Sequence, residues 1–361
     1  MWKLKSLFAG GSHELVGLDI SSSAVKLLEL SRRGDQYQVE SYSVEPLPPN
    51  AVNDKQINDP RVVGECIARC VSRAGTRTRH AALAVSGASV ITKVIQLPTD
   101  MSEYDLEEQI KAEADQHLPY RLDEVNFDFQ VLEQNKPGSN TRDVLLAACR
   151  KEQVETRCAA LEIAGLVPKV VDVEAYALEN ACRFLKHQIA NEGREQTVAV
   201  VDMGANSTSV LVLHDMEPTY TRDQAFGGKQ LTEDIMRHYA MTFEEAGKAK
   251  RFGGLPDNYR SEVLDHFVAD MAQQIDRSLQ FFFASSSRYS SIDQIILAGG
   301  CAHIPGVDQA MMERLQIPTV LARPFSNMTV SPRVKAQALA RDESALLIAC
   351  GLAYRAFDQE G

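Results

Sequence analysis

The chain has 361 residues, of which 44% are apolar and 24% are charged, as in an ordinary soluble globular protein. This length suits two domains or one elaborated α/β unit. The formal net charge of −11 makes the surface as a whole repel nucleic acid, so no nucleic-acid partner is expected. An acidic chain binds phosphate only through local devices such as backbone amides, a metal ion or single cations, and these are expected in loops.

Cysteine usage and the chain start indicate the compartment. Cys66 and Cys70 lie one helical turn apart, but nothing beside them completes a zinc site, and the other five cysteines are scattered. No stretch reaches the roughly 18 to 20 apolar residues that span a bilayer. The first eight residues lack the apolar core of a signal peptide, and they read as a frayed terminus or as a contact with a membrane surface or a partner. The sequence therefore predicts a cytoplasmic protein with reduced thiols.

The first elements in chain order are strands. Residues 16–30 read as an apolar strand, a small-residue turn and a second apolar strand, and residues 38–44 add a third, which predicts an antiparallel meander. Residues 61–75 are spaced as an amphipathic helix that ends at Gly75.

Residues 80–166 read as a small α/β block. Strands are predicted at 80–86 and 89–97, then a helix at 102–118 that Ser102 and Asp105 begin and Pro119 ends. Further strands at 125–133 and 143–150, separated by a loop at 135–141, precede a helix at 151–164.

The second half repeats the opening pattern. Residues 198–213 again read as strand, turn and strand, and helices follow, including one at 262–283. A short strand at 295–297 ends in Gly299 and Gly300, and residues 344–357 form a closing helix.

Two of these segments are an internal repeat. Leu18-Asp19-Ile20-Ser21-Ser22-Ser23 matches Val201-Asp202-Met203-Gly204-Ala205-Asn206, each with an Asp at the end of an apolar strand and small residues behind it. Such a repeat predicts two similar subdomains that face each other across a cleft. The small-residue turns can present backbone N–H groups to phosphate oxygens, and Asp19 and Asp202 can hold a hydrated Mg²⁺ ion between them.

A third segment joins this pair. Residues 295–306 end a strand in a double glycine and then begin a helix near Pro305 and Gly306. Two successive glycines let a flat ring lie on the backbone. Two phosphate turns followed by such a segment, in this order, predict a nucleotide site.

The ordered motifs resemble those of the actin-like ATPases, and the chain is most similar to the PilM family of the type IV pilus machinery, with the cell-division protein FtsA as a more distant relative. The resemblance covers nearly the whole chain. Its motifs are GLDISSSAVKLLEL, VEPLPPNAV, EADQHLPYRLDEVNFDF, DVLLAACRKEQVE, KVVDVEAYALENA, VVDMGANSTSVLVL, GGKQLTEDI, LAGGCAHIPG and ACGLAYRAF.

The resemblance implies an α/β fold of the actin-like (ribonuclease H-like) two-domain type with an FtsA-type inserted subdomain. Residues 1–79, 167–194 and 343–361 would form the first domain and 80–166 the inserted subdomain, which supports contacts to partners or to like subunits. Residues 195–342 would form the second domain, with a helical part at about 228–290.

It also implies a site for ATP and Mg²⁺, with roles for individual residues. The first phosphate turn would comprise Asp19, Ser21, Ser22 and Ser23 with Lys26 on the next strand, and the second would comprise Asp202, Gly204, Asn206, Ser207 and Thr208. Gly299, Gly300 and Ile304 would flank the adenine and ribose, and Lys229 and Glu233 would contact the nucleoside. Lys229 is alternatively a solvated surface lysine.

Asp172 and Glu174 are the candidates for orienting an attacking water molecule, while Glu174 alternatively caps the helix that begins there. Ser21 departs from the superfamily, in which many members carry Gly after the Asp, so the first turn is expected to hold phosphate less tightly. Because no strong base stands out, we expect ATP binding with hydrolysis that is weak or dependent on partners.

The implied main partner is the N-terminal cytoplasmic tail of the membrane protein PilN, bound as an extended peptide, together with other inner-membrane and motor proteins of the pilus. FtsA binds the membrane through a C-terminal amphipathic helix, whereas this chain ends in the acidic residues 357–361. Attachment to the inner membrane is therefore expected through partners only.

Three other functions are alternatives to this role. A small-molecule kinase of the same superfamily requires a strong catalytic Asp beside the phosphates. An FtsA-like filament former would self-associate in a nucleotide-sensitive way. A chaperone of the DnaK type requires a peptide-binding domain, for which the chain leaves no room after residue 361.

Overall fold

The computed structural model describes residues 14–53, 55–132, 140–286 and 288–357. Three predictions concern segments outside the described residues. They are those for the chain start, for most of the loop at 135–141 and for the acidic residues 358–361. Within the described part, none of the helices combines the length and the apolar character needed to cross a bilayer.

The first large sheet has six strands in the order β10 (Val167–Val173), β6 (His80–Val85), β1 (Val16–Ile20), β2 (Ala24–Arg33), β3 (Gln36–Pro46) and β16 (Thr329–Val330). The antiparallel meander β1-β2-β3 is confirmed, and β6 and β10 extend it as parallel strands. All five residues of β1 are buried, as in a strand that is covered on both faces.

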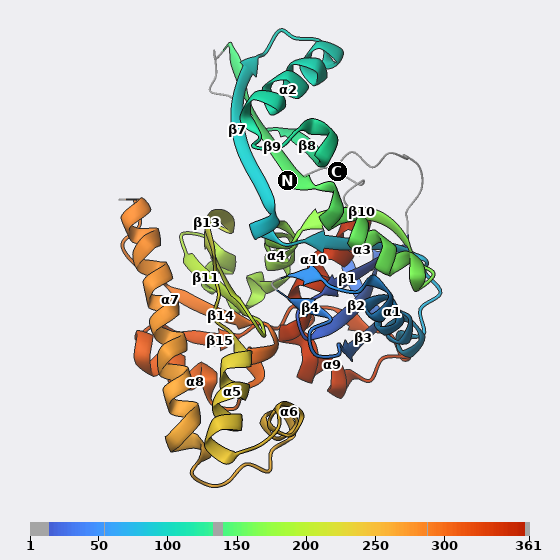
Figure 1. Ribbon diagram of the computed structural model, residues 1–361. Helices are drawn as coiled ribbons and strands as arrows, with labels where there is room; N and C mark the ends of the chain where they lie inside the picture. The colour runs from blue at the N-terminus through green and yellow to red at the C-terminus, as the bar shows by residue number, and fades with distance from the viewer. Residues whose placement is uncertain (1–13, 54, 133–139, 287, 358–361) are drawn as a thin grey trace.

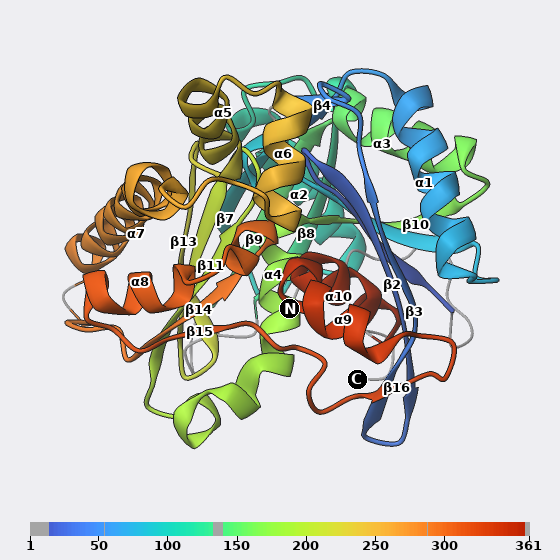
Figure 2. The ribbon, with the colours of Figure 1, turned by 90° about the horizontal axis from the view of Figure 1, so that it is seen from below.

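Helices cover both faces of this sheet. On one face lie α1 (Pro60–Ala74), which is the predicted amphipathic helix, and α3 (Lys151–Ile163); on the other lie α4 (Glu174–Cys182) and α10 (Leu347–Tyr354). Figure 2 shows α1 and α3 on one side of β2 and β3, with α10 on the opposite side. A short hairpin, β4 (Val52–Asn53) and β5 (Gln56–Ile57), precedes α1.

The helix α10 is wedged against α4. A Cβ atom placed on Gly351 would lie 1.7 Å from the carbonyl oxygen of Ala177, so only glycine permits this approach. The closing helix predicted at 344–357 is thus present as α10 with 3₁₀ turns at Glu343–Leu346 and Arg355–Phe357.

The second large sheet repeats the first. Its order is β13 (Glu217–Gln224), β12 (Thr208–His214), β11 (Thr197–Met203), β14 (Gln294–Ala298) and β15 (Thr319–Leu321). The hairpin β11-β12 corresponds to β1-β2, and β14 lies parallel to β11 as β6 lies parallel to β1. The predicted repeat in the sequence is therefore a repeat in the topology.

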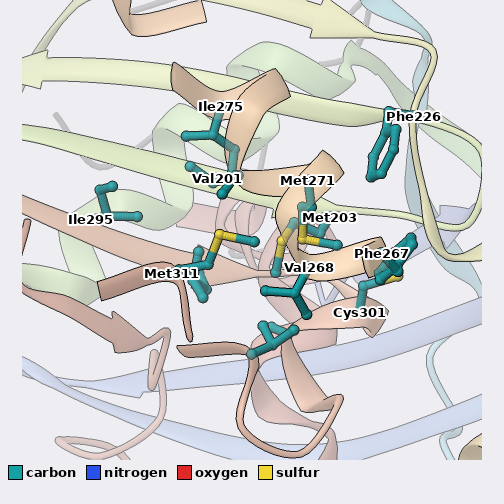
Figure 3. Close-up of a cluster of buried hydrophobic side chains, with 14 of the residues drawn as sticks. Val201, Met203, Phe226, Phe267, Val268, Met271, Ile275, Ile295, Cys301 and Met311 are labelled. Atoms are coloured by element: carbon teal, nitrogen blue, oxygen red, sulfur yellow. The ribbon is translucent and has the colours of Figure 1, made fainter. Parts of the chain in front are cut away.

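The core of this second unit lies between the sheet and its helices. They are α5 (Gly228–Tyr239), α6 (Phe243–Phe252), α7 (Asp265–Ser285) and α8 (Val307–Leu315), and a turn of π-helix at Arg260–Leu264 precedes α7. Figure 3 shows Met271 and Ile275 of α7 packed against Val201 and Met203 of β11. The helix predicted at 262–283 is confirmed, and its apolar face fills this core.

A third, smaller unit stands apart from both large sheets (Figure 1). It consists of β7 (Val90–Pro98), α2 (Glu103–His117), β8 (Val125–Val131) and β9 (Thr141–Arg150), with the strand order β7-β9-β8, and is called here the three-stranded module. The hydroxyl of Ser102 accepts a hydrogen bond from the Asp105 amide at 3.2 Å, which begins α2 as predicted. The module has its own buried cluster between α2 and the strands.

The module is narrower than the predicted block at 80–166. The strand β6 pairs with β1 and β10, and α3 packs on α1, because the chain from β6 to β10 is one parallel crossover into which the module is inserted. The strand β16 pairs with β3 of the first sheet, whereas the predicted boundary at residue 342 grouped it with the second. The helix α9 (Ala336–Asp342) then leads back to α10. The division of the chain into domains stays a prediction.

Candidate functional site

The first aspartate of the repeat lies in a hairpin with a lysine. Asp19 is 3% exposed, and its Oδ2 accepts a hydrogen bond from Nζ of Lys26, its cross-strand partner, at 2.8 Å. Burial favours the neutral amine of Lys26, but the carboxylates of Asp19 and Asp202 outweigh this effect and raise its pKa. The interaction of Lys26 with both aspartates brings the two halves of the repeat together.

The first turn is closed by its own side chain. The amide and the hydroxyl of Ser21 both donate to the carbonyl oxygen of Ala24, at 3.0 and 2.8 Å. Ser22 is partly buried, and the carbonyl of Ser23 accepts from the amide of Leu47 at 2.9 Å. The hydroxyl at position 21 therefore holds the turn in a shape that a glycine would leave open.

The second turn is equally tight. The amide of Gly204 donates to the carbonyl of Ser207 at 2.9 Å, and Asn206 lies partly buried between them. Thr208 is buried, and its hydroxyl donates to the carbonyl of Phe226 at 2.8 Å. The Thr208 side chain thus ties the turn to the chain before α5.

The double glycine meets the second aspartate. A Cβ on Gly299 would lie 2.4 Å from Oδ1 of Asp202 and 2.4 Å from the carbonyl of Met203, and Gly299 has φ 84° and ψ 172°, a conformation open essentially to glycine alone. Burial raises the pKa of Asp202 to about 6, against the opposing influence of Lys26 and Lys55. The predicted second and third motifs are therefore in direct contact.

A further junction centres on the carbonyl oxygen of Gly204. It accepts hydrogen bonds from the Gly228 amide at 3.0 Å and from the Cys301 thiol at 3.1 Å. Nζ of Lys250 donates to the Gly228 carbonyl at 2.8 Å and to the Thr232 hydroxyl at 2.7 Å. Burial lowers the pKa of Lys250. Neither Lys250 nor Cys301 could be identified as part of this junction from the sequence, because no local pattern marks a residue whose partners lie on other elements.

The other predicted nucleoside contacts lie around this junction. Lys229 and Glu233 are exposed on α5, and their side chains approach to 3.9 Å, the spacing of a helical ion pair. Gly300 is exposed with open space around it, and Ile304 is partly buried against the core of the second unit. Both readings of Lys229, as nucleoside contact or surface lysine, are compatible with this position.

The structure separates the two candidate catalytic carboxylates. Asp172, on β10, is buried and pairs with Nε of Arg355 at 3.2 Å. Glu174 begins α4, and its Oε2 accepts from Nζ of Lys55 at 2.6 Å. Val173 is the N-cap residue of α4 and no side chain bonds there, while Glu174 is the acidic residue of the first turn, where its charge interacts favourably with the positive end of the helix dipole. Lys55, the partner of Glu174, also interacts electrostatically with Asp202 and Asp19, so Glu174 is linked to the two aspartates of the repeat.

Lys55 itself is the main residue that the sequence did not reveal. It lies in the turn between β4 and β5, where its φ of 66° is left-handed. Burial alone would lower the pKa of Lys55, but Glu174, Asp202 and Asp19 raise it. In the sequence, only the polar turn before α1 marks this region. A local turn pattern cannot predict that the Lys55 side chain contacts Glu174 at the start of α4.

The donor set fits a magnesium ion only in part. Among the described residues, no group of three or more His, Cys, Asp or Glu side chains could hold a metal ion. Asp19 and Asp202 offer two carboxylates, which matches the preference of Mg²⁺ for one or two carboxylates completed by water and phosphate. The site thus suits a cation that arrives together with a phosphate ligand.

The chain is similar to known proteins in both sequence and fold. The family model described as type IV pilus assembly protein PilM matches residues 17–357. The solved PilM–PilN type IV pilus biogenesis complex is 29% identical, with a TM-score of 0.80, covering 96% of this chain and 100% of the other.

Two more distant structures share the fold. The ethanolamine utilization protein EutJ from Carboxydothermus hydrogenoformans is 17% identical, with a TM-score of 0.53 and coverage of 94% of this chain and 88% of EutJ. MreB5 of Spiroplasma citri, solved with AMPPNP, is 12% identical, with a TM-score of 0.50 and coverage of 97% of each chain. The fold is the actin-like α/β fold that the resemblance implied, and the chain belongs to the type IV pilus assembly protein PilM family.

Proposed function

We propose that this protein is a nucleotide-binding scaffold of the type IV pilus inner-membrane assembly platform, which couples its nucleotide state to pilus assembly. The observation that carries the proposal is the meeting of three motifs at one place. The turn after Asp19, the turn after Asp202 and the double glycine at Gly299 come from two sheets, yet Lys26 interacts with both aspartates and Gly299 lies against Asp202.

The nucleotide in this proposal is ATP. The amides of the turns at residues 21–23 and 204–208 bind phosphate oxygens, Lys26 neutralises their charge, and Gly299, Gly300 and Ile304 flank the adenosine. Lys229 and Glu233 contact the nucleoside from α5. A bound Mg²⁺ ion, held through water by Asp19 and Asp202, supplies further charge neutralisation. The fold shared with MreB5, which was solved with AMPPNP, supports a nucleotide in this cleft.

The partner is the N-terminal cytoplasmic tail of PilN, as the similarity to the PilM–PilN complex supports. We place the protein in the cytoplasm, at the face of the inner membrane, attached through PilN and other inner-membrane and motor proteins of the pilus rather than by itself. Self-association is compatible with this role, and nucleic acid is not a ligand because of the acidic surface.

Hydrolysis is expected to be slow in the isolated protein. Asp172 is engaged with Arg355, and Glu174, the remaining candidate for positioning water, is held by Lys55. A carboxylate that is held in an ion pair is not available to orient a water molecule for attack. A partner that draws Lys55 away from Glu174 would raise the rate.

The other functions considered are not favoured. A small-molecule kinase needs an unengaged catalytic Asp beside the phosphates, and the family assignment points to pilus assembly instead. The same assignment does not favour an FtsA-like filament former.

The test is a titration of the purified protein with a synthetic peptide that copies the N-terminal tail of the PilN encoded beside it, with and without Mg-ATP. We expect tight peptide binding whose Kd changes with Mg-ATP in the native protein and does not change in Asp202→Ala. Peptide binding that fails in both conditions while ATP still binds would show that the pilus role is wrong.

A further inference from the structure

One arginine at the root of the three-stranded module is buried in an unusual way. Arg157 on α3 is 1% exposed. Its Nε donates to the carbonyl of Ala84 at 3.0 Å, one terminal nitrogen donates to the carbonyl of Lys55, and the other lies 3.5 Å from the side-chain oxygen of Gln153. All three contacts are to neutral oxygens, and burial lowers the pKa of Arg157.

Among the described residues no carboxylate forms an ion pair with Arg157, and Glu174 and Asp19 favour its charge only from a distance, so burying the guanidinium is unfavourable. Packing alone does not account for such a residue, because an apolar side chain of similar size would fill the space without that cost. Its position must therefore serve the backbone segments that it joins.

These segments lie on the path between the cleft and the module. Ala84 is the next-to-last residue of β6, from which the chain enters the module. Arg157 lies on α3, which begins directly after β9, where the chain leaves the module. Lys55 is the cleft residue whose Nζ bonds Glu174. One side chain thus connects the entry and the exit of the module to the cleft.

The hydrophobic root of the module reaches the same place. Val85, Cys149 and Val173 form a buried cluster where β6, β9 and β10 end. Val173 immediately precedes Glu174, so a displacement of Glu174 is transmitted to the ends of the module strands. In Figure 1, β7 and β9 run down from the module to this root.

The root also faces the second sheet. A Cβ placed on Gly87, just before β7, would lie 3.6 Å from Oδ2 of Asp223 on β13. The other oxygen of Asp223 accepts from the hydroxyl of Ser209 at 2.6 Å, one residue beyond Thr208 of the second turn. The second turn is therefore linked to the module root through Ser209 and Asp223.

We propose that Arg157 is a positioning residue that couples nucleotide binding in the cleft to the orientation of the three-stranded module, and thereby to partner binding. The inference rests on the proposed function. When a polyphosphate enters beside Lys26 and Lys55, the Lys55 ammonium exchanges Glu174 for a phosphate oxygen. The carbonyl of Lys55 moves with its turn, Arg157 follows it, and the Ala84 carbonyl and α3 shift together.

The backbone of Lys55 suits such a movement. Its left-handed conformation is unfavourable for a residue with a side chain, so the turn has a conformation of lower intrinsic energy available. The hydrogen bond from Arg157 offsets this cost in the structure.

The test is a double titration of Arg157→Met, in which the apolar side chain keeps the volume but bonds neither carbonyl. The PilN tail peptide is titrated with and without Mg-ATP, and Mg-ATP with and without the peptide. Coupling in the native protein should change each Kd by the same factor, about 5 to 150-fold. In the variant we expect each ligand alone to bind within about threefold of native, with the factor reduced to about one.

Two further variants control for loss of stability. Arg183→Met removes a partly buried arginine that bonds Asn180 and stacks on Tyr354, far from the root, and it should keep the coupling. Arg157→Lys keeps a cation at the root but cannot bridge both carbonyls, so it should reduce the factor even if Arg157→Met does not fold.

The outcomes separate the two proposals. If the native protein couples its ligands and the Arg157 variants keep the full factor, the role of Arg157 is wrong while the scaffold function stands. If neither ligand changes the Kd of the other in the native protein, the nucleotide-coupled scaffold and the role of Arg157 are both wrong.

Discussion

At the scale of single residues, Asp202 combines a functional position with a cost to stability. Its pKa is raised from 3.8 to about 6 by burial, so the native state binds the proton more tightly than the unfolded chain. The free energy of unfolding must therefore fall as the pH rises from about 4 to about 6, and the loss remains at neutral pH. The charge of Asp202 therefore lowers the free energy of unfolding at neutral pH.

Asp202→Asn mimics the protonated side chain. We expect the variant to raise the free energy of unfolding at pH 7.5 by on the order of 2 kcal/mol, after allowance for solvent screening, and to weaken Mg-ATP binding. Urea unfolding at pH 7.5 and pH 4 measures the first effect. An equal gain at both pH values would contradict the raised pKa.

Two carboxylates only two positions apart should differ sharply in their contribution to stability. Asp172→Ala removes the carboxylate that pairs with the guanidinium of Arg355, whose side chain is 3% exposed, and breaking such a buried pair typically costs about 3 to 5 kcal/mol. Glu174→Ala serves as the matched control, because Lys55 is 23% exposed and can turn to water, so about 1 kcal/mol is expected. Similar urea midpoints for the two variants would show that the buried pair is not structural.

At the scale of elements, the close approach of the chain after β14 to the end of β11 requires a glycine at position 299. Gly299→Ala places a Cβ against Asp202 and Met203 at a φ of 84°, and we expect a loss of about 2 to 4 kcal/mol together with weaker ATP binding. Gly75→Ala is the control, since φ there is 67° but nothing lies within 4 Å of the added atom. It should cost about 1 kcal/mol and leave ATP binding unchanged. Equal losses in thermal unfolding would mean that backbone strain, and not the contact, decides.

Elements that rest on local patterns could be predicted from the sequence, whereas contacts between distant elements could not. The hairpins after Asp19 and Asp202 were predicted because their apolar strands and small-residue turns are local patterns, and residues 102 and 105 mark the start of α2 in the same way. Lys55 and Glu174 meet across 119 positions, and β16 joins β3 from almost the other end of the chain. Such pairings depend on the packed fold, and no local pattern encodes them.

At the scale of the whole molecule, a nucleotide beside Asp19 and Asp202 would add contacts between two sheets that already share a buried hydrophobic cluster with α4 and α10. Mg-ATP should therefore stabilise the entire protein, by about 2.7 kcal/mol at a concentration 100 times its Kd. Thermal unfolding of the native protein should shift upward with the logarithm of the Mg-ATP concentration. Asp202→Ala is the control and should show no shift; a shift of equal size in that variant would place the nucleotide elsewhere.

The wedge of α10 against α4 has a consequence for synthesis. The helix α10 can pack against α4 and β1 only when residues 347–354 have left the ribosome, some 330 residues after β1 was made. At about 5 to 20 residues per second, the apolar face of β1 waits roughly 15 to 70 s for its cover. The second unit, whose strands and helices all lie within a shorter stretch, can be complete before then. The nascent chain thus passes through a state in which one half is folded and the other still needs protection from aggregation.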